Sequence, residues 1–131
     1  MKKYFIYNLY LLIICLIACH QKTYPTNGET IYKTGKNIAG EKLLDSKTSR
    51  IHLFHSCKGC HGKSGNLMKD ASLQYAQLTS PAKYVVPYTE SLFFRFLDHD
   101  FKSDGTKANI GVIWKMSDQD KKDLWAYLQT L

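Results

Sequence analysis

The sequence of 131 residues lacks the residues that most cysteine-based metal sites require. It has four cysteines, Cys15, Cys19, Cys57 and Cys60. A structural zinc site takes about four ligands, and no second cysteine pair or H-x3-H pattern follows Cys57 and Cys60. The chain also lacks the alternating strand and helix pattern in which thioredoxin-type C-x-x-C pairs occur. These absences disfavour a zinc site and a dithiol redox pair, the two ordinary alternatives for this motif.

Acidic residues are few as well, 11 against 18 lysines and arginines, for a formal net charge of +7. The lysines are scattered along the chain, which disfavours nucleic acid as a partner. Apolar residues make up 44% and aromatic residues 13% of the sequence, which excludes an intrinsically disordered chain. The length allows one domain in addition to a targeting segment.

The N-terminus has no apolar run long enough for a comfortable membrane span, but it fits an export signal. Lys2 and Lys3 precede an almost uncharged apolar stretch over 4–18. The stretch ends in Leu-Ile-Ala-Cys19, which resembles the lipobox of bacterial lipoproteins. That resemblance implies a signal peptide over 1–18, lipidation of Cys19, and an extracytoplasmic chain anchored to a bacterial membrane, with the periplasmic side expected. An uncleaved N-terminal anchor is the alternative, and it gives the same location.

The most informative motif is Cys57-Lys58-Gly59-Cys60-His61-Gly62. C-x-x-C-H is the attachment signature of a c-type haem, in which two thiols add to the haem and the histidine ligates the iron. Two intervening residues let one helical turn carry both cysteines. We therefore predict one covalent haem c bound by Cys57, Cys60 and His61.

The rest of the chain is predicted to be all-α, without strands. Residues 19–39 are polar and are expected to form a flexible tether, and 40–131 the folded domain. Helices are expected over 46–58, over 70–78, from Thr89 to about Asp100, and from Ser117 to Leu131 with a capping box. Three or four short helices supply little core, so the haem is expected to complete it.

Residues 40–131 resemble class I monohaem cytochromes c. The resemblance rests on the C-x-x-C-H-G motif and on Met116-Ser117-Asp118-Gln119-Asp120 followed by Asp123-Leu124-Trp125-Ala126-Tyr127-Leu128. It implies a cytochrome c-like fold, whose first and last helices cross near the haem, and one-electron transfer as the activity. Trp114, Tyr127 and Phe96 are the aromatic residues expected against the porphyrin.

The sequence departs from that family at the sixth iron ligand. The family usually has Met-Pro several residues before the last helix, and residues 109–114 contain neither. Met116 is the first candidate, although the family usually has a core leucine there. His99, Met68 and an open sixth position are the alternatives. A thioether would raise the reduction potential and a second imidazole would lower it.

The leading hypothesis is a lipid-anchored electron carrier, not itself an enzyme, that exchanges electrons with redox proteins of the cell envelope. Lys58, Lys63 and Lys69 could steer acidic partners, or form a solvated surface without that role. A haem subunit of an envelope oxidoreductase complex is the second hypothesis. A ligand-binding haem protein with an open sixth site is the third.

Overall fold

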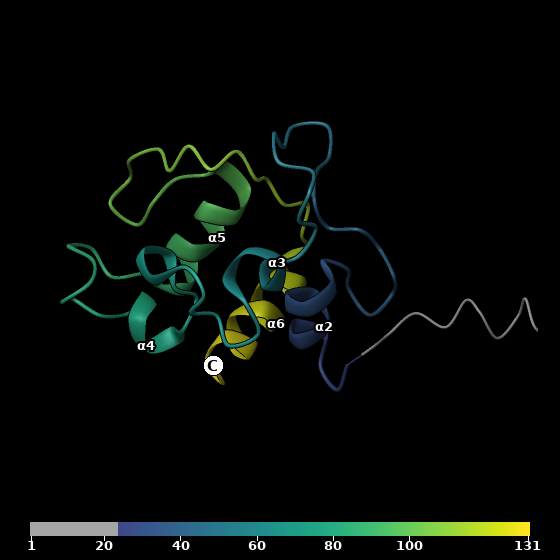
Figure 1. The fold of residues 1–131 in the computed structure, drawn as a ribbon, viewed down its shortest axis with the longest axis horizontal. Helices are drawn as coiled ribbons and strands as arrows, with labels where there is room; N and C mark the ends of the chain where they lie inside the picture. Colours follow the sequence, from purple (N-terminus) through teal and green to yellow (C-terminus); the bar gives the residue numbers. More distant parts are fainter. Residues whose placement is uncertain (1–23) are drawn as a thin grey trace, which may run out of the picture.

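The computed structural model describes residues 24–131. The predicted signal peptide and Cys19 lie outside the described residues. The elements in chain order are α2 (Asn27–Thr34), α3 (Cys57–His61), the 3-10 helix η1 (Lys69–Ala71), α4 (Tyr75–Leu78), α5 (Glu90–His99) and α6 (Asp118–Leu128). Figure 1 shows them joined by long irregular segments.

The all-α prediction is confirmed for this part of the chain. Residues 24–131 contain five α-helices and no strand. Extended pairing there is limited to three isolated bridges, Lys36 with Lys42, Leu44 with Trp114 and Phe101 with Lys107. No helix within these residues is long and apolar enough to span a membrane.

Helix α2 is a correction to the sequence analysis, which predicted a tether over 19–39. It begins after Thr26, whose hydroxyl accepts a hydrogen bond from the Glu29 N–H at 3.1 Å. Ile31 and Tyr32 are fully buried. The described part of the predicted tether is therefore part of the folded domain.

Helix α2 packs closely against α6 (Figure 1). A Cβ added at Gly28 would lie 1.9 Å from the carbonyl oxygen of Asp123, so only glycine allows this approach. The first and last described helices are thus in contact, whereas the resemblance implies a crossing near the haem, which the structure does not test. The first, however, is α2 and not the helix predicted over 46–58.

The helix predicted over 46–58 is wrong except at its end, where α3 begins at Cys57. Asp45 accepts hydrogen bonds from the Lys47 N–H at 3.0 Å and from the Thr48 hydroxyl at 2.7 Å. The Arg50 N–H donates to the Gly111 carbonyl at 2.8 Å. Turn bonds and bonds to a distant segment therefore take the place of helical ones.

The helix predicted over 70–78 is interrupted. The Ser72 hydroxyl donates to the Gly65 carbonyl and accepts from the Gln74 N–H, each at 3.2 Å. These bonds separate η1 from α4, because they hold Ser72 in an extended conformation.

The last two helices follow the prediction, except that α6 ends at Leu128 and not at Leu131. The Thr89 hydroxyl caps α5, and Ser117 and Asp120 form the capping box of α6. Helix α6 buries Leu124, Trp125 and Leu128, while Tyr127 and Leu131 are only partly buried. Phe93 of α5 packs on Trp125 with ring centroids 5.2 Å apart, so α5 and α6 share one core.

Candidate functional site

The C-x-x-C-H motif forms the whole of α3. Ser56 enters in an extended conformation, and the Gly59 N–H donates to its carbonyl at 3.0 Å. Gly62 ends the helix at φ 76°, which favours glycine. One helical turn therefore carries Cys57, Cys60 and His61, as predicted.

This turn borders a largely apolar cleft formed by two adjoining cavities. The first has a volume of about 200 Å³, is partly open to solvent, and is lined by Cys57, Cys60, His61, Phe54, Leu97, Val112 and Trp114, among others. The second is lined by Leu78, Tyr84, Tyr88, Lys102 and Ala108, among others. Both also contact His61, Ala71, Leu73, Phe93, Phe96 and Ile110. Shared walls make them two lobes of one cleft.

Burial keeps the Cys57 thiol protonated. Cys57 is only 8% exposed, and desolvation raises the pKa of its thiol to about 12. Reactive C-x-x-C pairs and zinc sites instead need a thiolate. Both cysteines are free, and no three His, Cys, Asp or Glu side chains between residues 24 and 131 converge to hold a metal ion. The raised pKa disfavours the Cys57 thiolate that a dithiol pair or a zinc site would use.

His61 is the one imidazole in the cleft. Its ring is half-buried, and Nδ1 is buried without a hydrogen-bond partner. Desolvation lowers the pKa of His61, although the Ala71 backbone partly opposes this. A neutral imidazole is the form that ligates iron. Two thiols, a half-buried imidazole and an apolar cleft together fit a covalent haem.

The residues considered as sixth ligands lie in different places. Met116, the first candidate, is 8% exposed and belongs to the hydrophobic core, and it does not line the cleft. His99 is exposed at the end of α5. Met68 does line the cleft and is 47% exposed.

The three aromatic residues expected against the porphyrin also lie in different places. Phe96 and Trp114 line the cleft. Tyr127 packs on Tyr32 between α6 and α2, with ring centroids 5.3 Å apart. The sequence reasoning missed Tyr88, Phe93 and Ile110 as lining residues. The apolar residues from Ile110 to Trp114 were the available signal.

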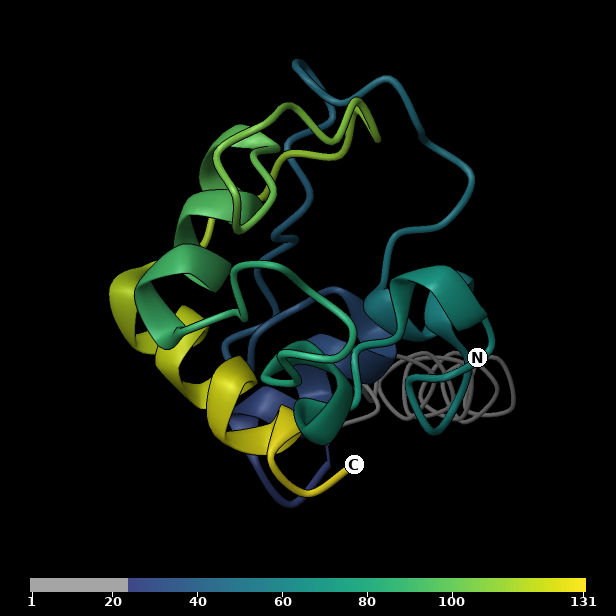
Figure 2. The ribbon, with the colours of Figure 1, turned by 90° about the vertical axis from the view of Figure 1, so that its left-hand side faces the viewer.

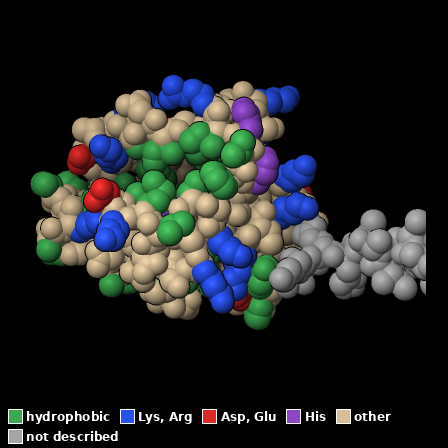
Figure 3. All heavy atoms as spheres, viewed as in Figure 1, with side chains coloured by type: hydrophobic (Ala, Val, Ile, Leu, Met, Phe, Trp, Pro, Cys, Tyr) green, Lys and Arg blue, Asp and Glu red, His purple; other side chains and the backbone are tan. Residues whose placement is uncertain are grey.

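The mouth of the cleft combines apolar and basic groups. Figure 3 shows hydrophobic side chains gathered between α5 and the segment leading into α3, with basic side chains and histidines at the margins. Leu53, Phe54 and Ile110 are among the exposed large hydrophobic residues. Lys58, Lys63 and Lys69 are exposed around the motif.

Comparison with known proteins adds no family to this description. No family model matches the chain, and no curated protein or solved structure does either.

Proposed function

We propose that this protein carries one haem c and transfers single electrons outside the cytoplasm, anchored to a bacterial membrane by lipid on Cys19. One observation carries the proposal: a single turn, α3, presents Cys57, Cys60 and His61 to an apolar cleft. The C-x-x-C-H spacing and the predicted export signal support it.

In this proposal the chain's own residues hold the haem and control its surroundings. The Cys57 and Cys60 sulfurs form the thioether bonds, and His61 is the iron ligand. The bound haem supplies reversible one-electron chemistry at iron. Leu97, Val112 and Trp114 exclude water from its apolar faces, and burial raises the reduction potential by disfavouring the more highly charged ferric site.

Redox proteins of the cell envelope are the proposed partners. The exposed Lys58, Lys63 and Lys69 lie around the motif and would attract acidic surfaces. Electron-transfer rates to an acidic partner should then fall as ionic strength rises. Rates that do not respond to salt would contradict steering without affecting haem attachment.

The proposed function is tested on the full chain, produced in a bacterium that attaches haem c. The purified protein should take up and release one electron per haem reversibly, and the Cys57→Ser, Cys60→Ser double variant should contain no covalent haem. His52→Ala is the control, because His52 is exposed and does not line the cleft. Exported, folded protein without haem would contradict the proposal.

The anchor has a separate test. Cys19→Ala should move the protein from the membrane fraction to the soluble extracytoplasmic fraction while haem attachment continues. Retention in the membrane would favour the uncleaved anchor.

A further inference from the structure

Two walls of the cleft differ in the groups that they could offer to iron. The first, called the His61 wall, consists of α3 and residues 62–73. The second, called the facing wall, consists of α5 and residues 100–114. Figure 2 shows α3 and α5 on different sides of the interior, with the 100–114 segment above α5. Residues from both walls line the same cavities.

Met68 belongs to the His61 wall. The Leu67 N–H donates to the His61 carbonyl at 3.0 Å, and a Cβ on Gly62 would lie 2.9 Å from the Leu67 Cβ. The segment that carries Met68 is thus folded back on the end of α3. Met68 therefore lies on the same wall as His61 and not on the wall across the cleft from it.

Met116 is held away from the cleft by its neighbours. The Lys115 N–H donates to the Leu43 carbonyl at 2.7 Å, and Ser117 caps α6. Met116 lies between these two fixed points with its side chain in the core. Moving its sulfur to the cleft would leave a cavity in the core.

The facing wall is almost entirely apolar. Phe93, Phe96, Ala108, Ile110 and Val112 line the cleft from it. The Ala108 N–H donates to the Asp100 carbonyl at 2.9 Å, and the Trp114 N–H to the Leu97 carbonyl at 3.1 Å, which fix this segment on α5. Among its side chains that line the cleft, only Lys102 carries a ligating atom, and Lys102 is exposed; Tyr84 and Tyr88, which also line the cleft, lie outside this wall.

We infer that this haem receives no sixth ligand from the protein and binds a small neutral diatomic molecule, of the carbon monoxide or nitric oxide type, on the side of the facing wall. The inference rests on the proposed haem at Cys57, Cys60 and His61. Phenyl and aliphatic groups favour a small neutral ligand over an anion, because they offer a charge no compensation.

Ligand binding would couple to electron transfer. Carbon monoxide binds ferrous and not ferric haem, so it stabilises the reduced state by mass action. The midpoint potential should therefore rise by about 59 mV for each tenfold increase in carbon monoxide above its dissociation constant, the value for a one-electron couple. The protein would donate electrons less readily when the ligand is present.

The test uses the full-length holoprotein with carbon monoxide as the probe. The ferrous protein should be high-spin and should bind one carbon monoxide per haem. Met116→Leu, Met68→Leu, His99→Ala and Lys102→Ala should each change the affinity by less than about twofold. An internal ligand bound 99% of the time would weaken binding by about 100-fold, so removing it would raise the affinity by that factor.

The outcomes separate the two proposals. A low-spin ferrous protein that does not bind carbon monoxide would overturn the inference while leaving the proposed haem in place. So would a rise of tenfold or more in affinity in any of the four variants. A chain without covalent haem would overturn the proposed function itself. The spectrum of the wild-type protein decides the question even if a variant fails to fold.

Discussion

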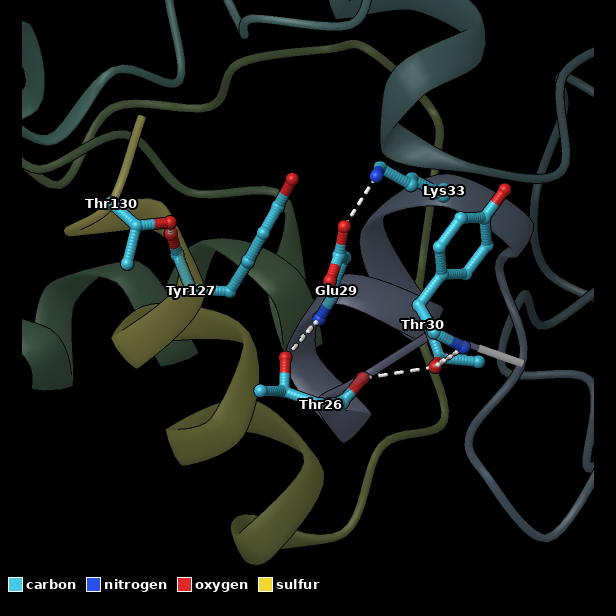
Figure 4. A network of polar contacts seen from close by, with 7 residues as sticks. Thr26, Glu29, Thr30, Lys33, Tyr127 and Thr130 are labelled. Carbon is cyan, nitrogen blue, oxygen red and sulfur yellow. Dashed lines mark hydrogen bonds and ion pairs between the residues drawn. The ribbon is translucent and has the colours of Figure 1, made fainter.

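The α2–α6 contact and the cleft differ in whether their polar groups find hydrogen-bond partners within the chain. Between α2 and α6 the polar groups are paired within the chain. The Asn27 side-chain amide donates to Asp120 at 3.0 Å and to Asp123 at 2.8 Å. Figure 4 shows the same pattern beside it, where Glu29 pairs with Lys33 and the Thr30 hydroxyl donates to the Thr26 carbonyl at 2.9 Å.

In the cleft, by contrast, some polar and apolar groups are not satisfied by other residues of the chain. His61 Nδ1 is buried without a partner, and Phe54 and Ile110 at the mouth are 47% and 42% exposed. Buried polar groups without partners and exposed apolar groups both cost free energy. The difference teaches that one half of the domain is stabilised by its own residues, whereas the other leaves groups unsatisfied that the proposed haem would cover.

The largest expected effect comes from His61. His61→Ala removes the proposed axial ligand, so we expect the yield of holoprotein to fall at least tenfold and the spectrum of any residual haem to change. Absorbance of the purified protein measures both. His52→Ala is the matched control and should have no effect, because His52 is exposed outside the cleft. Equal spectra in the two variants would contradict the role given to His61.

Gly28→Ala tests how closely α2 packs against α6. The new Cβ would lie 1.9 Å from the Asp123 carbonyl oxygen, so we expect a loss of about 3 kcal/mol in the free energy of unfolding. Denaturant titration measures it. Gly105→Ala is the control: nothing lies within 4 Å of its added Cβ, and the cost should be only the backbone strain at φ +87°, about 1 kcal/mol. If both variants lose equal stability, close packing at Gly28 is not the cause.

A smaller effect is expected at the start of α6. Ser117→Ala removes the hydroxyl that accepts from the Asp120 N–H at 3.1 Å, and should cost about 1 kcal/mol of stability. Thermal unfolding measures the loss, with the exposed Ser64→Ala as the control. Haem content should not change, since α6 packs on α2 and α5 and its cap lies outside the cleft.

The smallest expected effect is on the pH dependence of the free energy of unfolding, through Asp45. It is small because Lys115, one of the partners of Asp45, is 63% exposed. The Thr48 hydroxyl, helped by the Lys47 N–H and Lys115, lowers the pKa of Asp45 to about 2 against the opposing effect of burial. A lowered folded-state pKa stabilises the protein above the ordinary value near 4, and this contribution disappears as pH falls toward 2. In Asp45→Asn, the free energy of unfolding should therefore change less between pH 4 and pH 2 than it does in the wild-type protein. An unchanged slope would contradict this role.

The sequence predicted the parts of the structure that depend on local signals. The C-x-x-C-H turn and the capped helix from Ser117 each need only a few adjacent residues, and both are present. Helix α2 was missed because Gly28 is buried through contact with α6, a helix about ninety residues later. The helix predicted over 46–58 failed for a related reason, since Arg50 bonds to Gly111.

The sequence could not identify a sixth iron ligand, because sequence spacing does not show where side chains lie in the fold. Spacing alone left Met116, His99 and Met68 as candidates, because each lies within reach along the chain. Only the fold shows that Met116 is in the core, His99 is exposed and Met68 lies on the His61 wall. Which wall carries a side chain depends on how distant segments pack.

The most direct test of the central claim is the mass of the mature protein and of its tryptic peptides, after expression in a bacterium that attaches haem c. The account predicts a mass increase of one haem, confined to the tryptic peptides of residues 51–58 and 59–63, which the haem would join through Cys57 and Cys60. A folded, exported protein in which both cysteines are unmodified would contradict it.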